Sequence, residues 1–259
     1  MKYTKYVASA AGLLGLGALL VACSPAEPKL ESGYDFATPE TQAMQDDDFS
    51  NPGFMWVDIG AEEWATVDGE AGKSCESCHG DLSTMKGVTT SYPKYNADDK
   101  KMRALQHQIN NCRTEQMKAK AWKWESDQML GMSAIIKNQS KGMPLNVSIK
   151  GEAAPFYEKG KEFYFQRRGT LDMACKHCHI DYPGVKIRAE VLSNGLPNGF
   201  PTYRLKWQKL GSLHRRFRGC NSNIRAEPYE RGSEEYTNLE LFLTHRANGV
   251  AVESPSVRK

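Results

Sequence analysis

The sequences CESCH at residues 75–79 and CKHCH at residues 175–179 decide how this chain folds. Both match C-x-x-C-H, the attachment motif of c-type haem. Two thiols three residues apart on one helical turn can each add to a porphyrin vinyl group, and the following His lies under the iron. A zinc site would need a second Cys/His pair close to each motif, and none occurs at that spacing. The motifs therefore predict two covalently attached haem c groups, one in each half of the chain.

Six residues carry this prediction. The thioether-forming residues are Cys75, Cys78, Cys175 and Cys178, and the proximal iron ligands are His79 and His179.

An internal repeat with an offset of 100 residues supports the same division of the chain. A Gly with an aromatic residue four positions later precedes each motif, which is similar to the N-terminal helix of class I cytochromes c. In that helix the Gly allows a close crossing with the C-terminal helix, and the aromatic ring fills the crossing. The matching pairs are Gly60/Gly160, Glu62/Glu162, Trp64/Tyr164, Gly69/Gly169, Cys75/Cys175, His79/His179 and Asp81/Asp181.

The repeat continues downstream with small changes in length. Leu105 and Leu213 each lie seven residues before a lone cysteine, and apolar stretches at residues 129–136 and 239–243 predict a terminal helix in each half. Gly142 and Gly249 suit the ends of these helices. We therefore expect a mainly α fold of two tandem class I cytochrome c-like domains.

The lone cysteines, Cys112 and Cys220, stand where each half should supply its sixth iron ligand. They could form a disulfide between the halves, since exported proteins favour disulfides, or be inert buried residues, or each ligate the iron of its own haem. Like positions in both halves favour thiolate ligation, because ferric iron keeps a bound thiol deprotonated. The rival ligands are His107, Met117 and His214.

The segment of residues 204–225 contains seven basic residues and no acidic one, and Cys220 lies within it. A positive field lowers the pKa of a thiol and attracts small anions, and arginine binds oxyanions through parallel N–H donors. The run is either a solvated basic face or an anion-handling site. Its members are Arg204, Lys206, Lys209, Arg215, Arg216, Arg218 and Arg225.

The N-terminus is typical of an export signal. Two lysines precede an apolar run at residues 8–22, which is too short for a comfortable membrane span. Residues 20–23 resemble a bacterial lipobox, which would make Cys23 a lipidated residue and a lipid anchor; the alternative is an ordinary signal cut near Ala22. Pro, Glu, Asp, Ser and Thr dominate the residues that follow, as in a solvated tether.

These patterns divide the chain into four parts: a signal peptide at residues 1–22, an acidic flexible tether at 23–50, an N-terminal cytochrome c domain at 51–150 and a C-terminal catalytic domain at 151–259. The formal charge of the whole chain is only +3, which argues against nucleic-acid binding. The predicted location is the periplasm, with membrane tethering depending on Cys23.

The sequence resembles the SoxA family, the catalytic cytochrome subunits of the bacterial thiosulfate-oxidising system. The likeness covers roughly residues 45–259 and is most specific in the C-terminal half. Besides the two haem motifs it rests on RRFRGCN at 215–221, IRAEPY at 224–229, Gly232, Ser233, Glu235 and Tyr236, LELFL at 239–243, RANG at 246–249 and ESPSVR at 253–258.

This resemblance implies a heterodimer with a SoxX-like monohaem cytochrome, which joins thiosulfate oxidatively to a cysteine of a SoxYZ-like carrier and passes two electrons to haem. It implies that Cys220 is both a haem ligand and the active centre, carried as a persulfide. The substrate-positioning arginine of the family falls on Arg216, with Arg246 and Arg218 as further candidates. The rival interpretations are a dihaem electron carrier without a substrate site and a structural subunit.

Overall fold

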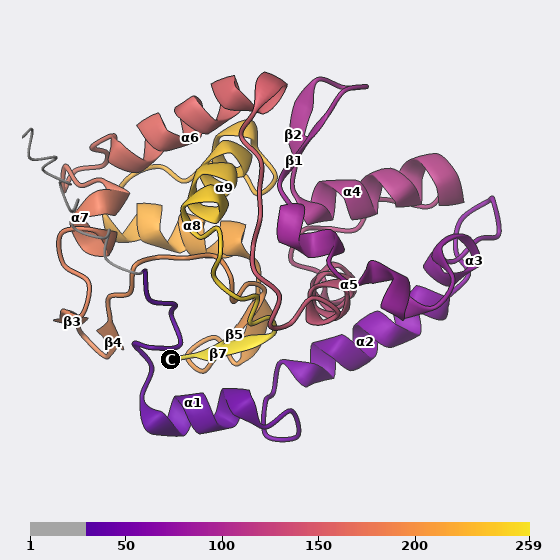
Figure 1. Cartoon of the computed structure of the whole chain (residues 1–259), viewed down its shortest axis with the longest axis horizontal. Coiled ribbons are helices and arrows are strands. Elements are labelled where there is room, and N and C mark those ends of the chain that lie inside the picture. The colour runs from indigo at the N-terminus through magenta and orange to yellow at the C-terminus, as the bar shows by residue number, and fades with distance from the viewer. Residues whose placement is uncertain (1–29) are drawn as a thin grey trace, which may run out of the picture.

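Each half of the chain is built around a pair of crossed helices. The computed structural model describes residues 30–259, so the predicted signal peptide and Cys23 lie outside the described residues. In the N-terminal half, α2 (Phe54–Ala65) crosses α5 (Asp127–Asn138), and a Cβ on Gly60 would lie 2.4 Å from the carbonyl oxygen of Gly131. Only a residue without a side chain permits this approach. Figure 1 shows this half as the indigo to magenta elements on the right.

The C-terminal half repeats the arrangement. Here α6 (Ala154–Phe165) crosses α9 (Glu234–Arg246), and a Cβ on Gly160 would lie 2.0 Å from the carbonyl oxygen of Asn238. Tyr164, which corresponds to Trp64, is buried against Phe242 at a ring-centroid distance of 5.0 Å. The predicted fold class is confirmed, and the two terminal helices end three or four residues before Gly249 and Gly142 respectively.

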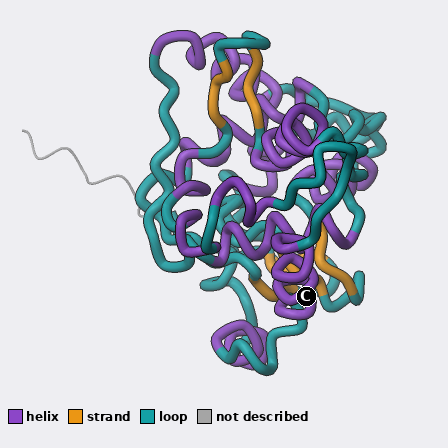
Figure 2. The backbone as a smooth tube through the Cα atoms, turned by 90° about the vertical axis from the view of Figure 1, so that its right-hand side faces the viewer, coloured by secondary structure: helices purple, strands orange, loops and turns teal. Residues whose placement is uncertain are grey.

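The remaining elements connect these helix pairs (Figures 1 and 2). The helical ones are α1 (Pro39–Asp46), α3 (Cys75–His79), η1 (Leu82–Met85), η2 (Val88–Ser91), α4 (Leu105–Asn111), the π-helical turn η3 (Cys112–Met117), η4 (Gly151–Ala153), α7 (Cys175–His179) and α8 (Leu213–Asn223). The strands are β1 (Lys94–Asn96), β2 (Lys101–Arg103), β3 (Lys186–Ile187), β4 (Glu190–Val191), β5 (Thr202–Arg204), β6 (Lys209–Gly211) and β7 (Ser256–Arg258).

The two halves share a core. β5 lies between β6, which is antiparallel to it, and β7, which is parallel to it. Leu210 and Val257 of this sheet pack against Leu130 and Ala134 of α5 in the other half, and all four are buried. The linker at residues 141–153 also pairs with the C-terminal segment, since the N–H of Leu145 donates to the carbonyl oxygen of Val250.

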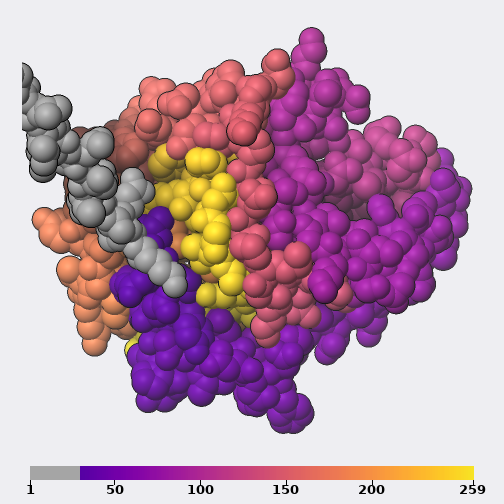
Figure 3. Space-filling model, in the orientation of Figure 1, coloured from indigo at the N-terminus to yellow at the C-terminus, as the bar shows by residue number. Residues whose placement is uncertain are grey.

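The predicted flexible tether does not extend through the described part of residues 23–50. Residues 39–46 form α1, which begins at the N-cap Thr38, and α1 packs against β7. Gln45 accepts the N–H of Val257 at 3.0 Å, and Asn51 donates to the carbonyl oxygen of Pro255 at 2.9 Å. Figure 3 shows this indigo segment against the yellow C-terminal residues. The amino-acid composition predicted a solvated segment, because composition alone gives no sign of these specific hydrogen bonds.

Two antiparallel hairpins project from the fold. The β1–β2 hairpin belongs to the N-terminal half and the β3–β4 hairpin follows the second haem motif (Figures 1 and 2). Within residues 30–259 no helix combines the length and the apolarity that crossing a membrane requires.

Candidate functional site

The two haem motifs occupy equivalent short helices. Ser74 is the N-cap of α3, and its side chain accepts the N–H of Ser77 at 3.0 Å, while Ala174 is the N-cap of α7. Cys75 and Cys175 each lie against the hydrophobic core of their own half. Burial raises the pKa of the Cys75 thiol to about 11 and that of Cys175 to about 12, so both free thiols are uncharged near neutral pH.

In both halves a loop beside the motif packs on the segment that follows the lone cysteine. Gly69 has φ +72° and its missing side chain faces the carbonyl oxygen of Met117, while Gly169 has φ +67° and faces that of Ile224. Any larger residue would clash there. The repeat read from the sequence therefore extends to individual backbone contacts.

The donor set in the C-terminal half fits a c-type haem. The Nδ1 atom of His179 is 2.8 Å from the carbonyl oxygen of Ser193, so Nδ1 donates and Nε2 is left free to bind iron. Gly195, with φ +71°, lies against the same imidazole ring. His179 is one of the groups that lower the pKa of the Cys220 thiol on α8, so the two predicted axial ligands lie near each other.

Cys220 differs from the haem-attachment cysteines in its electrostatics. Burial alone would raise the pKa of its thiol, but Arg216, the hydrogen bond with His179 and Arg204 together lower the pKa to about 7. The thiolate in turn raises the pKa of the Arg216 guanidinium. A thiolate next to a fixed cation is the reactive form of cysteine.

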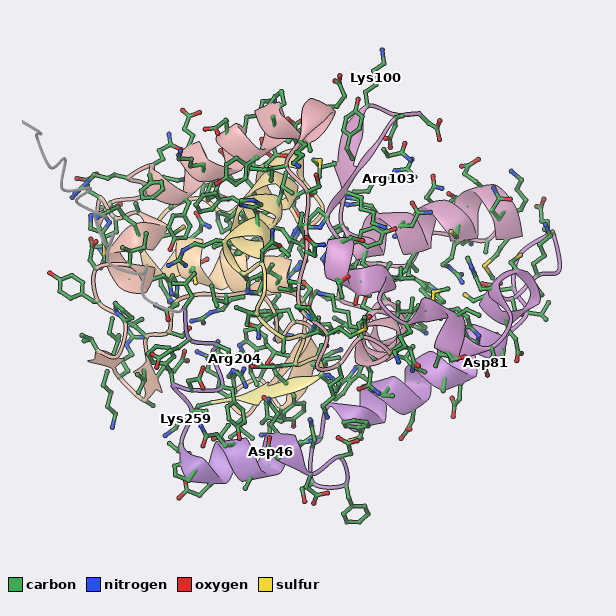
Figure 4. The ribbon with its side chains drawn as sticks, viewed as in Figure 1. Asp46, Asp81, Lys100, Arg103, Arg204 and Lys259 are labelled. Atoms are coloured by element: carbon green, nitrogen blue, oxygen red, sulfur yellow. The ribbon has the colours of Figure 1, made fainter. Side chains whose placement is uncertain are left out.

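Arg216 reaches Cys220 because it lies four residues earlier on α8, and positions i and i+4 share one face of a helix. Its Nη2 atom is also 3.4 Å from an oxygen of Glu190 on β4. The same carboxylate pairs with Arg204 at 2.7 Å and with Lys206. Arg204 is buried at 5% exposure, and it donates to the carbonyl oxygen of Lys259 (Figure 4).

The basic run is not a uniform basic face. Six of its seven cations form ion pairs with carboxylates from other segments. These carboxylates are Asp127 for Lys209, Glu125 for Arg215, Glu230 for Arg218, and Glu190 for Arg204, Lys206 and Arg216. The unbalanced charge is concentrated around Glu190, where three cations share one carboxylate.

The structure does not bring Arg218 and Arg246 into the group around the thiol. Arg218 precedes Cys220 by two residues, which places it on another face of α8, and it donates to the carbonyl oxygen of Tyr229. Arg246 donates to the carbonyl oxygen of Asn194 at 2.6 Å. Arg246 thereby contacts the loop whose Ser193 carbonyl oxygen lies 2.8 Å from the His179 Nδ1 atom.

In the N-terminal half an uncharged side chain stands at the helix position that Arg216 holds in the C-terminal half. Gln108, four residues before Cys112, donates from Nε2 to the Cys112 sulfur at 3.4 Å. The Trp64 ring lies 5.9 Å from that of His79, and its N–H donates to the carbonyl oxygen of Gly80. The same residue types are present, so His79 and Cys112 also fit a haem.

The rival histidine ligands are used elsewhere. His107 accepts the N–H of Ala104 at 3.1 Å and lies 3.0 Å from the carbonyl oxygen of Gly232. His214 accepts the N–H of Gly232 at 2.9 Å and pairs with Glu240 at 3.0 Å. Both rings therefore have no free nitrogen for iron, and instead they join α4 to α8 through the backbone of one residue, Gly232.

Two alternatives are left to compare with the structure: Met117 as an iron ligand, and a disulfide between Cys112 and Cys220. Met117 is buried at 4% exposure, at the end of the π-helical turn that packs on Gly69. All six described cysteines are free, so no disulfide joins Cys112 to Cys220. These observations favour the two cysteines as the remaining axial ligands.

Sequence reasoning did not single out Glu190, and it counted Arg204 only as one member of the basic run. Glu190 is thirty residues from Cys220 along the chain, and no motif connects them. The absence of any acid within residues 204–225 was the one available signal, since a dense group of cations needs a carboxylate from elsewhere.

Comparisons with known proteins agree with this geometry. A family model described as the cytochrome c domain of SoxA/TsdA matches residues 59–145. The chain is 45% identical over 230 residues to the L-cysteine S-thiosulfotransferase subunit SoxA of Pseudaminobacter salicylatoxidans, covering 88% of this chain and 80% of that protein. It is 43% identical over 231 residues to the subunit of the same name from Rhodovulum sulfidophilum, covering 89% and 80%.

Among solved structures, the chain is similar to one in the crystal structure of SoxXA from P. pantotrophus. The TM-score is 0.86 at 41% sequence identity, and the match covers 89% of this chain and 87% of the other.

Proposed function

The chain belongs to the SoxA family of L-cysteine S-thiosulfotransferase subunits, and from this premise we propose that Cys220 is the sulfur centre at which thiosulfate is joined to a carrier cysteine. The observation that carries the proposal is the group formed by Cys220, His179 and Arg216. It combines a thiol of lowered pKa, a fixed cation and an imidazole next to that thiol. Such a group suits the reaction of an anionic sulfur compound.

We propose two haem c groups, one for each half, and a division of labour between a domain at residues 51–150 and a domain at residues 151–259. Thioether bonds from Cys75, Cys78, Cys175 and Cys178 would hold them. The axial pairs would be His79 with Cys112 and His179 with Cys220. Haem supplies the one-electron acceptor that this oxidation needs.

The residues of the C-terminal half would handle the substrate as follows. Arg216 binds the sulfonate oxygens of thiosulfate through its N–H donors, and this contact directs the terminal sulfur towards the Cys220 sulfur, carried as a persulfide. The carrier thiol loses its proton, and one S–S bond forms between thiosulfate and the carrier cysteine. This step releases two electrons. Arg246 supports it by holding the loop that orients His179.

A SoxX-like cytochrome would be the partner subunit, because the related solved structure is a SoxXA complex. A SoxYZ-like carrier would supply the acceptor cysteine. We place the protein in the periplasm, since the N-terminal residues are typical of an export signal and covalent haem attachment accompanies export. A lipid on Cys23 would tether it to a membrane.

Mass spectrometry of the carrier tests this function directly. The haem-loaded complex, incubated with thiosulfate, an electron acceptor and a SoxYZ-type carrier, should add one thiosulfate-derived group to the carrier cysteine, and Cys220 should carry an extra sulfur atom. An electron-transfer cytochrome without a substrate site would be reduced by a partner but leave the carrier mass unchanged. That result would refute the proposed activity.

A further inference from the structure

The β3–β4 hairpin is an exposed element with few ties to the rest of the protein. Its backbone hydrogen bonds close on themselves, as between the N–H of Gly184 and the carbonyl oxygen of Leu192 at 2.7 Å. Val185, Ile187 and Val191 are all at least 40% exposed. The hairpin forms part of the orange surface at the left edge of the molecule in Figure 3. Short exposed elements of this kind open at low free-energy cost.

One side chain ties this hairpin to the body. Among the hydrogen bonds and ion pairs of residues 182–192, those that reach other described residues all involve Glu190. Although burial acts to raise it, the contacts with Lys206 and Arg204 lower the pKa of Glu190 to about 2. The carboxylate is therefore ionised wherever the protein is folded and active.

One partner of Glu190, Arg216, also interacts with the proposed catalytic sulfur of Cys220. Arg216 interacts electrostatically with both Cys220 and Glu190. Its contact with Glu190 is the longer one, at 3.4 Å, against 2.7 Å for Arg204. Arg204 stays in place through its bonds to the carbonyl oxygen of Lys259. Three cations face the one side-chain carboxylate of Glu190 here.

We propose that Glu190 occupies the oxyanion site formed by Arg204, Lys206 and Arg216, and that a divalent sulfur oxyanion binds there by displacing the Glu190 carboxylate and releasing the hairpin. This inference deepens the proposed function and rests on it. The carboxylate keeps Arg204, the one buried cation of the three, paired when no substrate is present, because an unpaired buried charge is costly. A dianion with more oxygens satisfies the same three cations better.

Displacement is feasible because the ion pairs are partly exposed. Side-chain exposures of 24% for Arg216, 25% for Glu190 and 48% for Lys206 place them in contact with solvent. Pairs in such surroundings contribute little net stability. Glu190 would therefore reduce the apparent affinity for the oxyanion in proportion to the fraction of time that the site is free of the carboxylate.

The test is the affinity of the haem-loaded complex for sulfate, a dianion without redox chemistry, measured by calorimetry at constant ionic strength. Glu190→Gln should tighten sulfate binding about fivefold to tenfold, because the competitor loses its charge. Glu230→Gln is the matched control, since Glu230 pairs with Arg218 as Glu190 does with Arg216; it should stay within about twofold of the wild type. Unchanged or weaker binding by Glu190→Gln would mean that Glu190 positions Arg216, and would overturn the proposal.

A second measurement needs no variant. Sulfate added to the wild-type complex should accelerate hydrogen exchange of the amides at residues 184–192, whereas exchange that stays unchanged or slows would contradict displacement. Both measurements are independent of turnover. If the carrier is never loaded with thiosulfate, the proposed function fails while these results still decide whether Glu190 fills an anion site.

Discussion

The two halves differ most clearly at the helix position four residues before the lone cysteine. In the N-terminal half that position is Gln108, which donates a neutral hydrogen bond to Cys112 at 3.4 Å. In the C-terminal half it is Arg216, whose charge acts on Cys220. The backbone plan is the same, down to the glycines at the helix crossings. Under the proposed function, this one charged side chain distinguishes the site that would carry out the chemistry from the site that would only hold a haem.

The neighbouring arginines reinforce this contrast. Arg113, next to Cys112, is buried at 4% exposure, pairs with Asp68 at 2.5 Å and lies 3.7 Å from the centre of the Trp122 ring. Both its charge and the face of its guanidinium group are therefore engaged in contacts within the N-terminal half. In the C-terminal half the ion pair of Arg216 is the 3.4 Å contact to Glu190, beside its interaction with the Cys220 sulfur, so its N–H donors are less fully used.

Removing each lone sulfur should give the largest difference between the halves. We expect Cys220→Ser to lower the rate of carrier loading by at least about 1,000-fold, because it removes the reacting atom. Cys112→Ser should keep the rate within about tenfold, because it alters only a ligand distant from the chemistry. The measurement is the initial rate of thiosulfate conjugation by the complex, with haem content checked by absorbance. Equal losses of rate in both variants would mean that the two lone cysteines do not differ in function.

Exchanging the residues that stand four positions before the lone cysteines should show more clearly how the two halves differ. Arg216→Gln gives the C-terminal half the side chain of Gln108 and should lower kcat/KM for thiosulfate about 100-fold, the usual cost of losing one strong oxyanion donor. The reverse variant Gln108→Arg should leave kcat/KM unchanged. Steady-state kinetics at two ionic strengths separates the roles, since only the wild-type contact weakens with salt. An Arg216→Gln variant with normal KM and kcat would make the arginine dispensable.

The same comparison explains how much could be predicted from the sequence. The haem motifs, the repeat and the lone cysteines are local patterns with fixed spacing, and they led to the correct fold class. Arg216 followed only from the resemblance to the SoxA family, because spacing within the basic run could not tell which arginine faces the thiol. Arg218 was a further candidate, and the structure places it on another face of α8, where it donates to the carbonyl oxygen of Tyr229.

What the sequence could not predict depends on contacts between distant segments. Glu190 reaches the arginines only because the hairpin folds back onto β5, and Gln45 is ordered only because β7 lies beside α1. Neither contact produces a periodic or local pattern in the sequence. The acidic composition of residues 23–50 therefore suggested a tether where part of the segment forms a packed helix.

The crossing glycines should show a smaller effect, on stability. Gly160→Ala places a Cβ 2.0 Å from the Asn238 carbonyl oxygen and should destabilise the fold by about 2–3 kcal/mol. Gly60→Ala meets the Gly131 carbonyl oxygen at 2.4 Å and should cost somewhat less. The control Lys161→Ala, at an exposed neighbouring position, should change the free energy of unfolding by less than about 0.5 kcal/mol.

Denaturant titration followed by circular dichroism measures all three variants. If Gly160→Ala were as stable as the control, α6 and α9 would not cross as closely as α2 and α5, and the structural equivalence of the halves would be lost.

The smallest expected difference is the response to acid. Asp68 and Arg168 hold the same place in the repeat, but only Asp68 is a carboxylate. The Arg113 side chain and the N–H of Gly69 lower its pKa below the ordinary 3.8. Because the folded-state pKa is the lower one, this stabilisation is complete well above pH 3.8 and is lost as the pH falls towards the folded value. The carboxylate is 49% exposed, so the contribution should stay below about 1 kcal/mol.

Asp68→Asn should therefore be less stable than the wild type at pH 6, and the difference should shrink as the pH falls from about 5 to about 2. The matched control is Asp172→Asn, which removes an exposed pair with Arg167 in the equivalent loop of the C-terminal half. Free energies of unfolding at each pH, for all three proteins, give the measurement. A difference that is independent of pH would show that Asp68 acts through packing of its loop, because only the loss of its charge follows the protonation of the carboxylate.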